Sequence, residues 1–147
     1  MDNIDLTVLF LEQLSSKNQL IMDRRLTKII QGDSFVLSYL YTHNCQAYPK
    51  EISEAMAVST ARVAKILGEL NSQGMILRKN DEKDNRKAVI VLTPKGIKRA
   101  TELRENAIKK FEIVLSALSE EEIKEFIRIG EKLNMSFLDN LDIFNDD

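Results

Sequence analysis

Cysteine, histidine, glycine, proline and tryptophan are all scarce in this chain of 147 residues. Its one cysteine, Cys45, cannot form an internal disulfide, and its one histidine, His43, cannot build a histidine-based metal cage. These two counts exclude most zinc sites and most Ser-His or Cys-His hydrolases. Five glycines and two prolines exclude a collagen-like or low-complexity chain and favour long helices.

Long apolar runs are also missing, and those present are far shorter than the ~20 residues that span a bilayer. The first ten residues, MDNIDLTVLF, contain no basic segment or small-residue cleavage site, so no secretory leader is expected. We therefore expect a cytoplasmic protein with no membrane partner and no cofactor. The length suits one domain, 1–147, with a single core.

Charge is unevenly distributed, although the net charge is only −2. Residues 1–61 carry a net charge of −2, residues 62–104 carry +6 and residues 105–147 carry −6. A basic block between acidic flanks is expected when one surface meets a polyanion such as DNA. Chance clustering of solvated charges is the alternative interpretation.

Apolar spacing and capping residues predict the order of the elements. Gly32 should end the first helix, Asp33 should cap the second, Pro49 should begin the third, and Ser59 should cap the fourth, which Gly74 ends. Ser119 and Glu122 have the spacing of a capping box before the last helix. The predicted helices cover 4–30, 34–44, a short segment from 49, 59–73, 94–118 and 120–141, and the predicted strands cover 75–79 and 87–92.

This order predicts a mainly α fold with a small β-wing, that is, a winged helix-turn-helix over about 33–93. Long helices over about 4–31 and 94–141 flank it and are expected to dimerise. The outer face of the helix over 59–73 would enter the DNA major groove. The DNA-facing residues predicted there are Ser59, Thr60, Arg62 and Lys65. The alternative is that Ser59 is only a helix cap and that both cations are solvated.

The segment between the two predicted strands is polar and basic. Lys83, Arg86 and Lys87 are expected to lie over the DNA backbone, where a guanidinium can enter the minor groove. Asp84 stands two residues before Arg86 and is expected to brace it rather than to contact a phosphate.

These residues resemble the MarR family of prokaryotic transcription regulators. The wing signature of that family is matched by Asp84-Asn85-Arg86 followed by Leu92-Thr93-Pro94-Lys95-Gly96. Residues 58–70, Gly74 and the helix opening at 118–122 are similar to further parts of the family pattern. In element order and length the resemblance covers essentially the whole chain.

The resemblance implies a homodimer that straddles a pseudo-palindromic double-stranded DNA operator and represses transcription until an effector releases it. It also implies that Arg86 is the minor-groove arginine, Asp84 its brace, and Ser59 to Lys65 the major-groove surface. The chain departs from the family pattern at Asp81-Glu82-Lys83, where a second acid–arginine pair is common. Cys45 also lies far from the N-terminal position usual for thiol sensors of the family.

The last residues are unusually apolar, which independently favours a partner chain over a large monomeric core. The apolar residues there are Phe126, Ile127, Leu133, Met135, Phe137, Leu138, Leu141, Ile143 and Phe144. A second cluster, Tyr39, Tyr41, His43 and Tyr48, is either an effector pocket or ordinary packing.

Two other classes of function compete with DNA binding. An enzyme needs a nucleophile with a base, or paired acids in a cleft, and no such set is evident, so no catalytic residue is predicted. A winged-helix module that binds proteins rather than DNA is the main alternative. Its recognition face would be acidic or apolar and its wing short, whereas this chain has Arg62, Lys65 and a basic wing.

Overall fold

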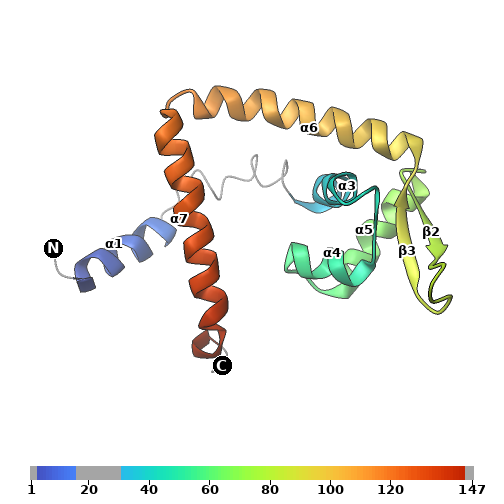
Figure 1. Cartoon of the computed structure of the whole chain (residues 1–147), viewed down its shortest axis with the longest axis horizontal. Coiled ribbons are helices and arrows are strands. Elements are labelled where there is room, and N and C mark those ends of the chain that lie inside the picture. Colours follow the sequence, from blue (N-terminus) through green and yellow to red (C-terminus); the bar gives the residue numbers. More distant parts are fainter. Residues whose placement is uncertain (1–2, 16–30, 145–147) are drawn as a thin grey trace. The chain divides into compact units, whose positions relative to one another are not determined.

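The computed structural model describes residues 3–15 and 31–144 and divides into two compact units, Met1–Ala107 and Ile108–Asp147. Helices dominate, with one small sheet, as predicted (Figure 1). The elements are α1 (Asn3–Ser15), α3 (Gly32–Thr42), β1 (Gln46–Ala47), α4 (Pro49–Met56), α5 (Thr60–Ser72), β2 (Ile76–Asn80), β3 (Ala88–Leu92), α6 (Pro94–Leu115), α7 (Glu120–Asp139) and a short 3-10 helix (Leu141–Phe144).

Helices α4 and α5 form the helix-turn-helix. Pro49 occupies the first turn of α4, where its missing N–H leaves no hydrogen bond unmade. Ala57 ends that helix in the left-handed region at φ 51°. The buried Ser53 hydroxyl donates to the Val58 carbonyl at 2.7 Å, and the Val58 N–H donates to the Ser53 carbonyl at 3.2 Å. These two bonds fix the turn and therefore the direction in which α5 leaves it.

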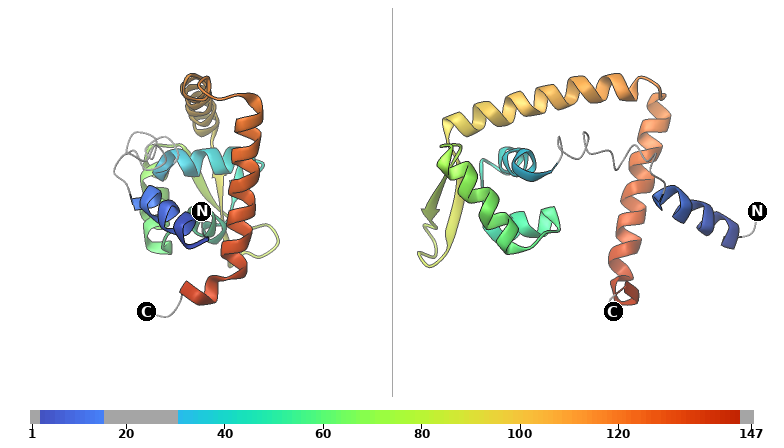
Figure 2. Two further views of the ribbon diagram at one scale, coloured as in Figure 1. Left: turned by 90° about the vertical axis from the view of Figure 1, so that its left-hand side faces the viewer. Right: turned by 180° about the vertical axis from the view of Figure 1, so that it is seen from behind.

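Three antiparallel strands form the sheet in the order β1-β3-β2. Ile76 pairs with Leu92 and Asn80 with Ala88, so β2 and β3 make a hairpin whose turn covers 81–87. Both views in Figure 2 show this turn at the end of the hairpin away from the start of α6. Strand β1, which pairs Ala47 with Ile90, was not predicted, because two residues carry no detectable alternation.

We name residues 31–107 the winged body. Its core contains residues of α3, β1, α4, α5, β2, β3 and the first part of α6. Its largest fully buried side chains are Leu40, Ile52, Leu70, Ile76, Ile90, Val36 and Val63. The apolar residues of α5 at helical spacing are all buried, namely Val63, Ile66, Leu67 and Leu70, as the sequence period predicts. On α4, Ile52 and Ser53 are buried and Ala55 is exposed, although apolar spacing from Ile52 predicts Ala55 on the inner face.

Several predicted boundaries need correction. Helix α3 starts at Gly32 after an N-cap at Gln31, so Asp33 is not its cap. Asp33 instead accepts a hydrogen bond from the Ser34 N–H, a local arrangement that the sequence pattern does not distinguish from a cap. Helix α6 ends at Leu115 and α7 at Asp139, each a little earlier than expected. The predicted first helix is present over Asn3–Ser15, and its part over 16–30 lies outside the described residues.

Helix α7 begins with the predicted capping box. The Ser119 hydroxyl accepts from the Glu122 N–H at 3.2 Å, and the Glu122 carboxylate accepts from the Ser119 N–H at 2.8 Å. No residue of α7 is buried. Among the described residues, no helix combines the length and the apolar character that a membrane span requires.

Candidate nucleic-acid interface

The outer face of α5 is polar and cationic. Thr60, Arg62 and Lys65 are exposed on it, while the apolar stripe of the same helix faces the core. Its first turn holds no acidic residue, so the positive end of the helix dipole is not neutralised there. This face therefore offers cations and backbone N–H groups to an anionic partner.

Ser59 caps α5, as the sequence predicted. Its hydroxyl accepts a hydrogen bond from the Arg62 N–H at 3.3 Å. That bond uses the oxygen as an acceptor and leaves the hydroxyl proton able to donate to a phosphate. The cap and the predicted DNA contact of Ser59 are therefore compatible.

The wing turn has hydrogen bonds of its own. The Asp81 N–H donates to the Lys87 carbonyl at 2.9 Å, and the Lys87 N–H donates to the Asp84 carbonyl at 2.9 Å. Lys83, Arg86 and Lys87 are all exposed on this turn. The three predicted wing cations thus lie on one short, internally bonded loop.

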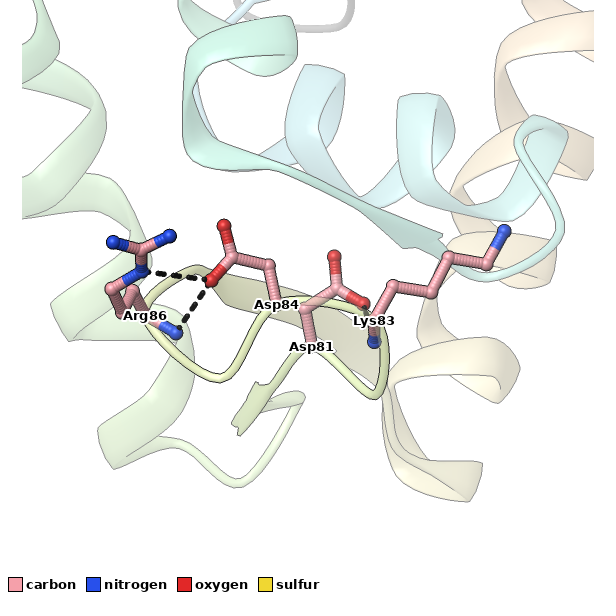
Figure 3. A network of polar contacts seen from close by, with 4 residues as sticks. All are labelled: Asp81, Lys83, Asp84 and Arg86. Carbon is pink, nitrogen blue, oxygen red and sulfur yellow. Dashed lines mark hydrogen bonds and ion pairs between the residues drawn. The ribbon is translucent and has the colours of Figure 1, made fainter.

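Asp84 contacts Arg86 as the sequence predicted (Figure 3). One carboxylate oxygen, Oδ1, accepts from the Arg86 backbone N–H at 3.1 Å and from its Nε at 3.3 Å. The Arg86 side chain is 93% exposed and that of Asp84 is 33% exposed. A pair this exposed contributes little to stability, and whether it fixes the direction of the guanidinium stays a prediction. Its role in DNA binding stays a prediction.

Asp81 is a wing residue whose role the sequence analysis missed. Its Oδ1 accepts from the Lys83 N–H at 2.9 Å, the same aspartate-to-second-residue contact that Asp84 makes with Arg86. Its Oδ2 accepts a hydrogen bond from the Tyr48 hydroxyl. The Tyr48 hydrogen bond and then the Lys83 N–H lower the pKa of Asp81, and the same bond to Asp81 raises the pKa of Tyr48. The repeated Asp-x-cation spacing at 81–83 and 84–86 was the available signal.

Lys83 differs from Arg86 in direction. Figure 3 shows the two cationic side chains extending to opposite sides of the aspartates. Lys83 contacts Asp81 through its backbone N–H, and its ammonium group extends away from the two aspartates (Figure 3). Lys83 therefore does not copy the arrangement of Arg86.

The Leu-Thr-x-x-Gly part of the wing signature closes the winged body rather than facing a partner. The Thr93 hydroxyl donates to the Gly74 carbonyl at 2.6 Å and accepts from the Gly96 N–H at 3.0 Å. A Cβ on Gly96 would lie 1.9 Å from the Met75 carbonyl oxygen. Only glycine permits this approach of α6 to the segment that follows α5.

Three of the four residues predicted to form a pocket line one hollow of about 630 Å³. Tyr39, His43 and Tyr48 border it together with Asp81 and other residues of β1, β3 and the wing. The Tyr39 and His43 rings stack with centroids 3.9 Å apart, because residues four apart share a helix face. Tyr41 is exposed and does not line the hollow, since it stands on a different face of α3.

Comparison with solved structures identifies the fold. A MarR family transcription regulator superposes with a TM-score of 0.74 at 19% identity, over 92% of this chain and 95% of that chain. The Staphylococcus aureus MepR–DNA complex gives 0.63 at 23%, over 93% and 99%. Bordetella bronchiseptica BpsR gives 0.61 at 18%, over 89% and 86%. The chain has the fold of MarR family transcription regulators.

No protein-family model matches the sequence itself. The likeness to MarR structures therefore lies in the order and packing of the elements, including the winged helix-turn-helix and the long helices. Within that MarR fold, α5 is the helix in the recognition position and the β2–β3 hairpin is the wing.

Proposed function

We propose that this protein is a sequence-specific, double-stranded DNA-binding transcription regulator in the cytoplasm, acting as a homodimeric repressor that a small-molecule effector releases. The observation that carries the proposal is the wing. Arg86 stands almost fully exposed on a hairpin directly after the cationic face of α5, with its guanidinium oriented by Asp84.

The major-groove part of the proposal rests on α5. Arg62 and Lys65 are both exposed on α5. In the proposed complex Arg62 would bond guanine bidentately, and Lys65, one turn further along the helix, would contact a phosphate. Ser59 and Thr60 stand at the N-terminus of α5, where anions are favoured. MepR, a protein of the same fold, is bound to DNA in its complex.

The minor-groove part rests on Arg86, with Lys83 and Lys87 meeting the flanking phosphates. A narrow minor groove in A·T-rich sequence concentrates negative potential and attracts an inserted guanidinium. Arg86 would therefore sense A·T content beside each half-site without reading individual bases.

The dimer is supported by exposed apolar side chains on the long helices. On α7, Phe126 is 64% exposed, Ile127 53% and Leu133 52%, and on α1 Phe10 is 47% exposed. Exposure of this extent is typical of a surface that a partner covers. A two-fold dimer would present two winged bodies to a pseudo-palindromic operator.

The effector is supported by the hollow between α3 and the wing. Tyr39, His43 and Tyr48 provide ring faces and hydroxyl groups beside wing residues, so a ligand there would contact both. DNA binding by BpsR, which has this fold, is regulated by 6-hydroxynicotinic acid. Ordinary packing of the stacked rings is the alternative, and the effector experiment below tests it.

Selection of bound fragments from genomic DNA tests the proposed function. We expect enrichment of a site with two inverted half-sites about one helical turn apart. Sedimentation at micromolar concentration should give about twice the chain mass of 16.8 kDa. Absence of any enriched sequence would contradict DNA recognition and favour the protein-binding module.

Release can be tested on the selected site. Aromatic metabolites are screened for those that release the protein from the selected DNA site. Each active compound is then tested on the Tyr39→Ala variant and on the control variant Tyr41→Ala, whose residue lies outside the hollow. A compound whose effect survives Tyr39→Ala would place the effector elsewhere.

A further inference from the structure

One hydrogen bond joins the wing to the start of the helix-turn-helix. The Tyr48 hydroxyl donates to Asp81 Oδ2 across 33 positions of sequence. Tyr48 is the N-cap of α4, and its backbone is held there: its N–H donates to the Glu51 carboxylate at 2.7 Å and its carbonyl accepts from the Ile52 N–H at 3.2 Å. Tyr48 therefore offers the wing a fixed point.

Asp81 gathers three hydrogen bonds at the opposite end of this contact. Besides the Tyr48 hydroxyl, its carboxylate accepts from the Lys83 N–H, and its own N–H donates to the Lys87 carbonyl. Bonds to an ionised acceptor are stronger than bonds between neutral groups. Asp81 thus contacts both sides of the wing turn, one through its carboxylate and the other through its backbone N–H.

The bonds continue to the proposed minor-groove residue. The Lys87 N–H donates to the Asp84 carbonyl, and the Asp84 carboxylate accepts from Arg86. A continuous chain of contacts therefore runs from Tyr48 through Asp81, Lys87 and Asp84 to Arg86. Strands β2 and β3 are held by β1 and by the core, so this chain of contacts acts on the turn over 81–87 rather than on the strands.

We propose that Tyr48 and Asp81 are positioning residues that hold the wing against the start of α4 and so set where Arg86 meets the minor groove. The proposal rests on the proposed DNA-binding function. Neither residue contacts DNA in this role. Loss of the Tyr48–Asp81 hydrogen bond, here called the tie, removes no cation from the wing. The wing must then become ordered when DNA binds, and this entropic cost weakens the minor-groove contact of Arg86.

Tyr48→Phe tests the tie without changing any charge at neutral pH. It keeps the ring and removes only the hydroxyl that Asp81 accepts from. Tyr41→Phe is the matched control, because it removes the hydroxyl of an exposed tyrosine outside the hollow. We expect Tyr48→Phe to bind the selected site about 2- to 10-fold more weakly and to lose preference for A·T-rich flanks, with Tyr41→Phe unchanged.

Asp81→Ala gives a second test, because simple electrostatics and loss of the Tyr48–Asp81 hydrogen bond predict opposite changes in DNA affinity. Removal of a carboxylate near DNA should tighten binding by electrostatics alone, as the charge-matched control Glu82→Ala is expected to show. Loss of the tie should weaken binding. Weaker binding by Asp81→Ala beside equal or tighter binding by Glu82→Ala supports the proposal, and tightening in both variants overturns it.

Two measurements without DNA separate failure of the tie from failure of the function. Tyr48 has a raised pKa because of Asp81, so ultraviolet titration of Asp81→Ala should show one tyrosine ionising at lower pH than in the wild type. Tyr48→Phe should also speed hydrogen exchange at the Lys83 and Lys87 amides. Unchanged titration and exchange overturn the tie whether or not the protein binds DNA. If both change but no sequence is selected, the DNA-binding function alone has failed.

Discussion

The winged body and the C-terminal unit, residues 108–144, differ in how far their apolar side chains are buried. The winged body buries Leu40, Ile52 and Ile90 almost completely among its own helices and strands. Helix α7 buries none of its residues, and Phe126 and Leu133, which share one face of it, are 64% and 52% exposed. The winged body therefore buries its largest apolar side chains within its own fold, whereas α7 leaves its apolar side chains exposed to an extent typical of interaction surfaces.

Net charge also differs between the two parts of the chain, although its boundary lies a few residues earlier. The segment 62–104, which holds α5 and the wing, carries a net charge of +6, and residues 105–147 carry −6. A polyanion is attracted to the first and repelled by the second. Under the proposed function, DNA recognition belongs to the segment 62–104 and dimerisation to α7, so substitutions in the two regions should affect DNA binding and dimerisation separately.

The largest effect is expected from Phe126→Glu on α7. Burial of a phenylalanine is worth about 1.5–3 kcal/mol, and a two-fold interface repeats each contact, so the dimer should lose about 3–6 kcal/mol. Sedimentation should then report a monomer at micromolar concentration, while the winged body keeps its fold by circular dichroism.

The control for this variant is Lys132→Glu, which also places a carboxylate on α7 but on its polar face. It should remain dimeric. If both variants stay dimeric, the exposed apolar face of α7 is not the interface and the contrast drawn above fails.

Gly96→Ala should break the winged body instead. Its Cβ would lie 1.9 Å from the Met75 carbonyl oxygen, so backbone must move, at a cost of about 1–3 kcal/mol in the free energy of unfolding. Gly68→Ala on α5 is the matched control, because nothing lies within 4 Å of its added Cβ. That variant should gain about 0.5–1 kcal/mol from helix propensity. Urea unfolding measures both, and equal signs would contradict the close approach.

Arg62→Ala sharpens the assignment of recognition to α5. We expect a loss of about 1–3 kcal/mol on the selected site and relaxed preference at one base pair per half-site. Lys65→Ala is the contrast, since loss of a phosphate contact should weaken binding to all sequences and flatten the log–log salt slope by about 0.9. Both are read from titrations at several salt concentrations. Unchanged binding in both variants would remove α5 from the interface.

The smallest expected effect is that of Asp84→Ala. The carboxylate orients Arg86, so its loss should weaken binding about 2- to 10-fold through added ordering cost, although one negative charge is removed. Arg86→Ala should lose more affinity and also the preference for A·T-rich flanks. A titration of Asp84→Ala at fixed salt decides the point. Tighter binding would show that Asp84 is only a tolerated surface charge.

Most of the winged body could be predicted because its signals are local. Ser59 is a cap with a fixed spacing to Arg62, whose N–H it bonds, and the stripe from Val63 to Leu70 has the helical period. The two-residue strand β1 and the burial of Ser53 could not be predicted in this way. Strand β1 forms by pairing with Ile90, and Ser53 is buried with its hydroxyl bonded to the Val58 carbonyl. Apolar periodicity predicts neither contact.

The candidate site divides along the same line. The sequence by itself determined the amphipathic α5, the wing cations and the Asp84–Arg86 contact, because each follows from residues within one helical period or one turn. Only the tertiary structure decided that Tyr48 bonds Asp81, that Tyr39 and His43 share a hollow with the wing, and that Gly96 lies against Met75. The physical reason is that these contacts join residues 21 or more positions apart, so their geometry exists only after the core has packed the helices against the sheet.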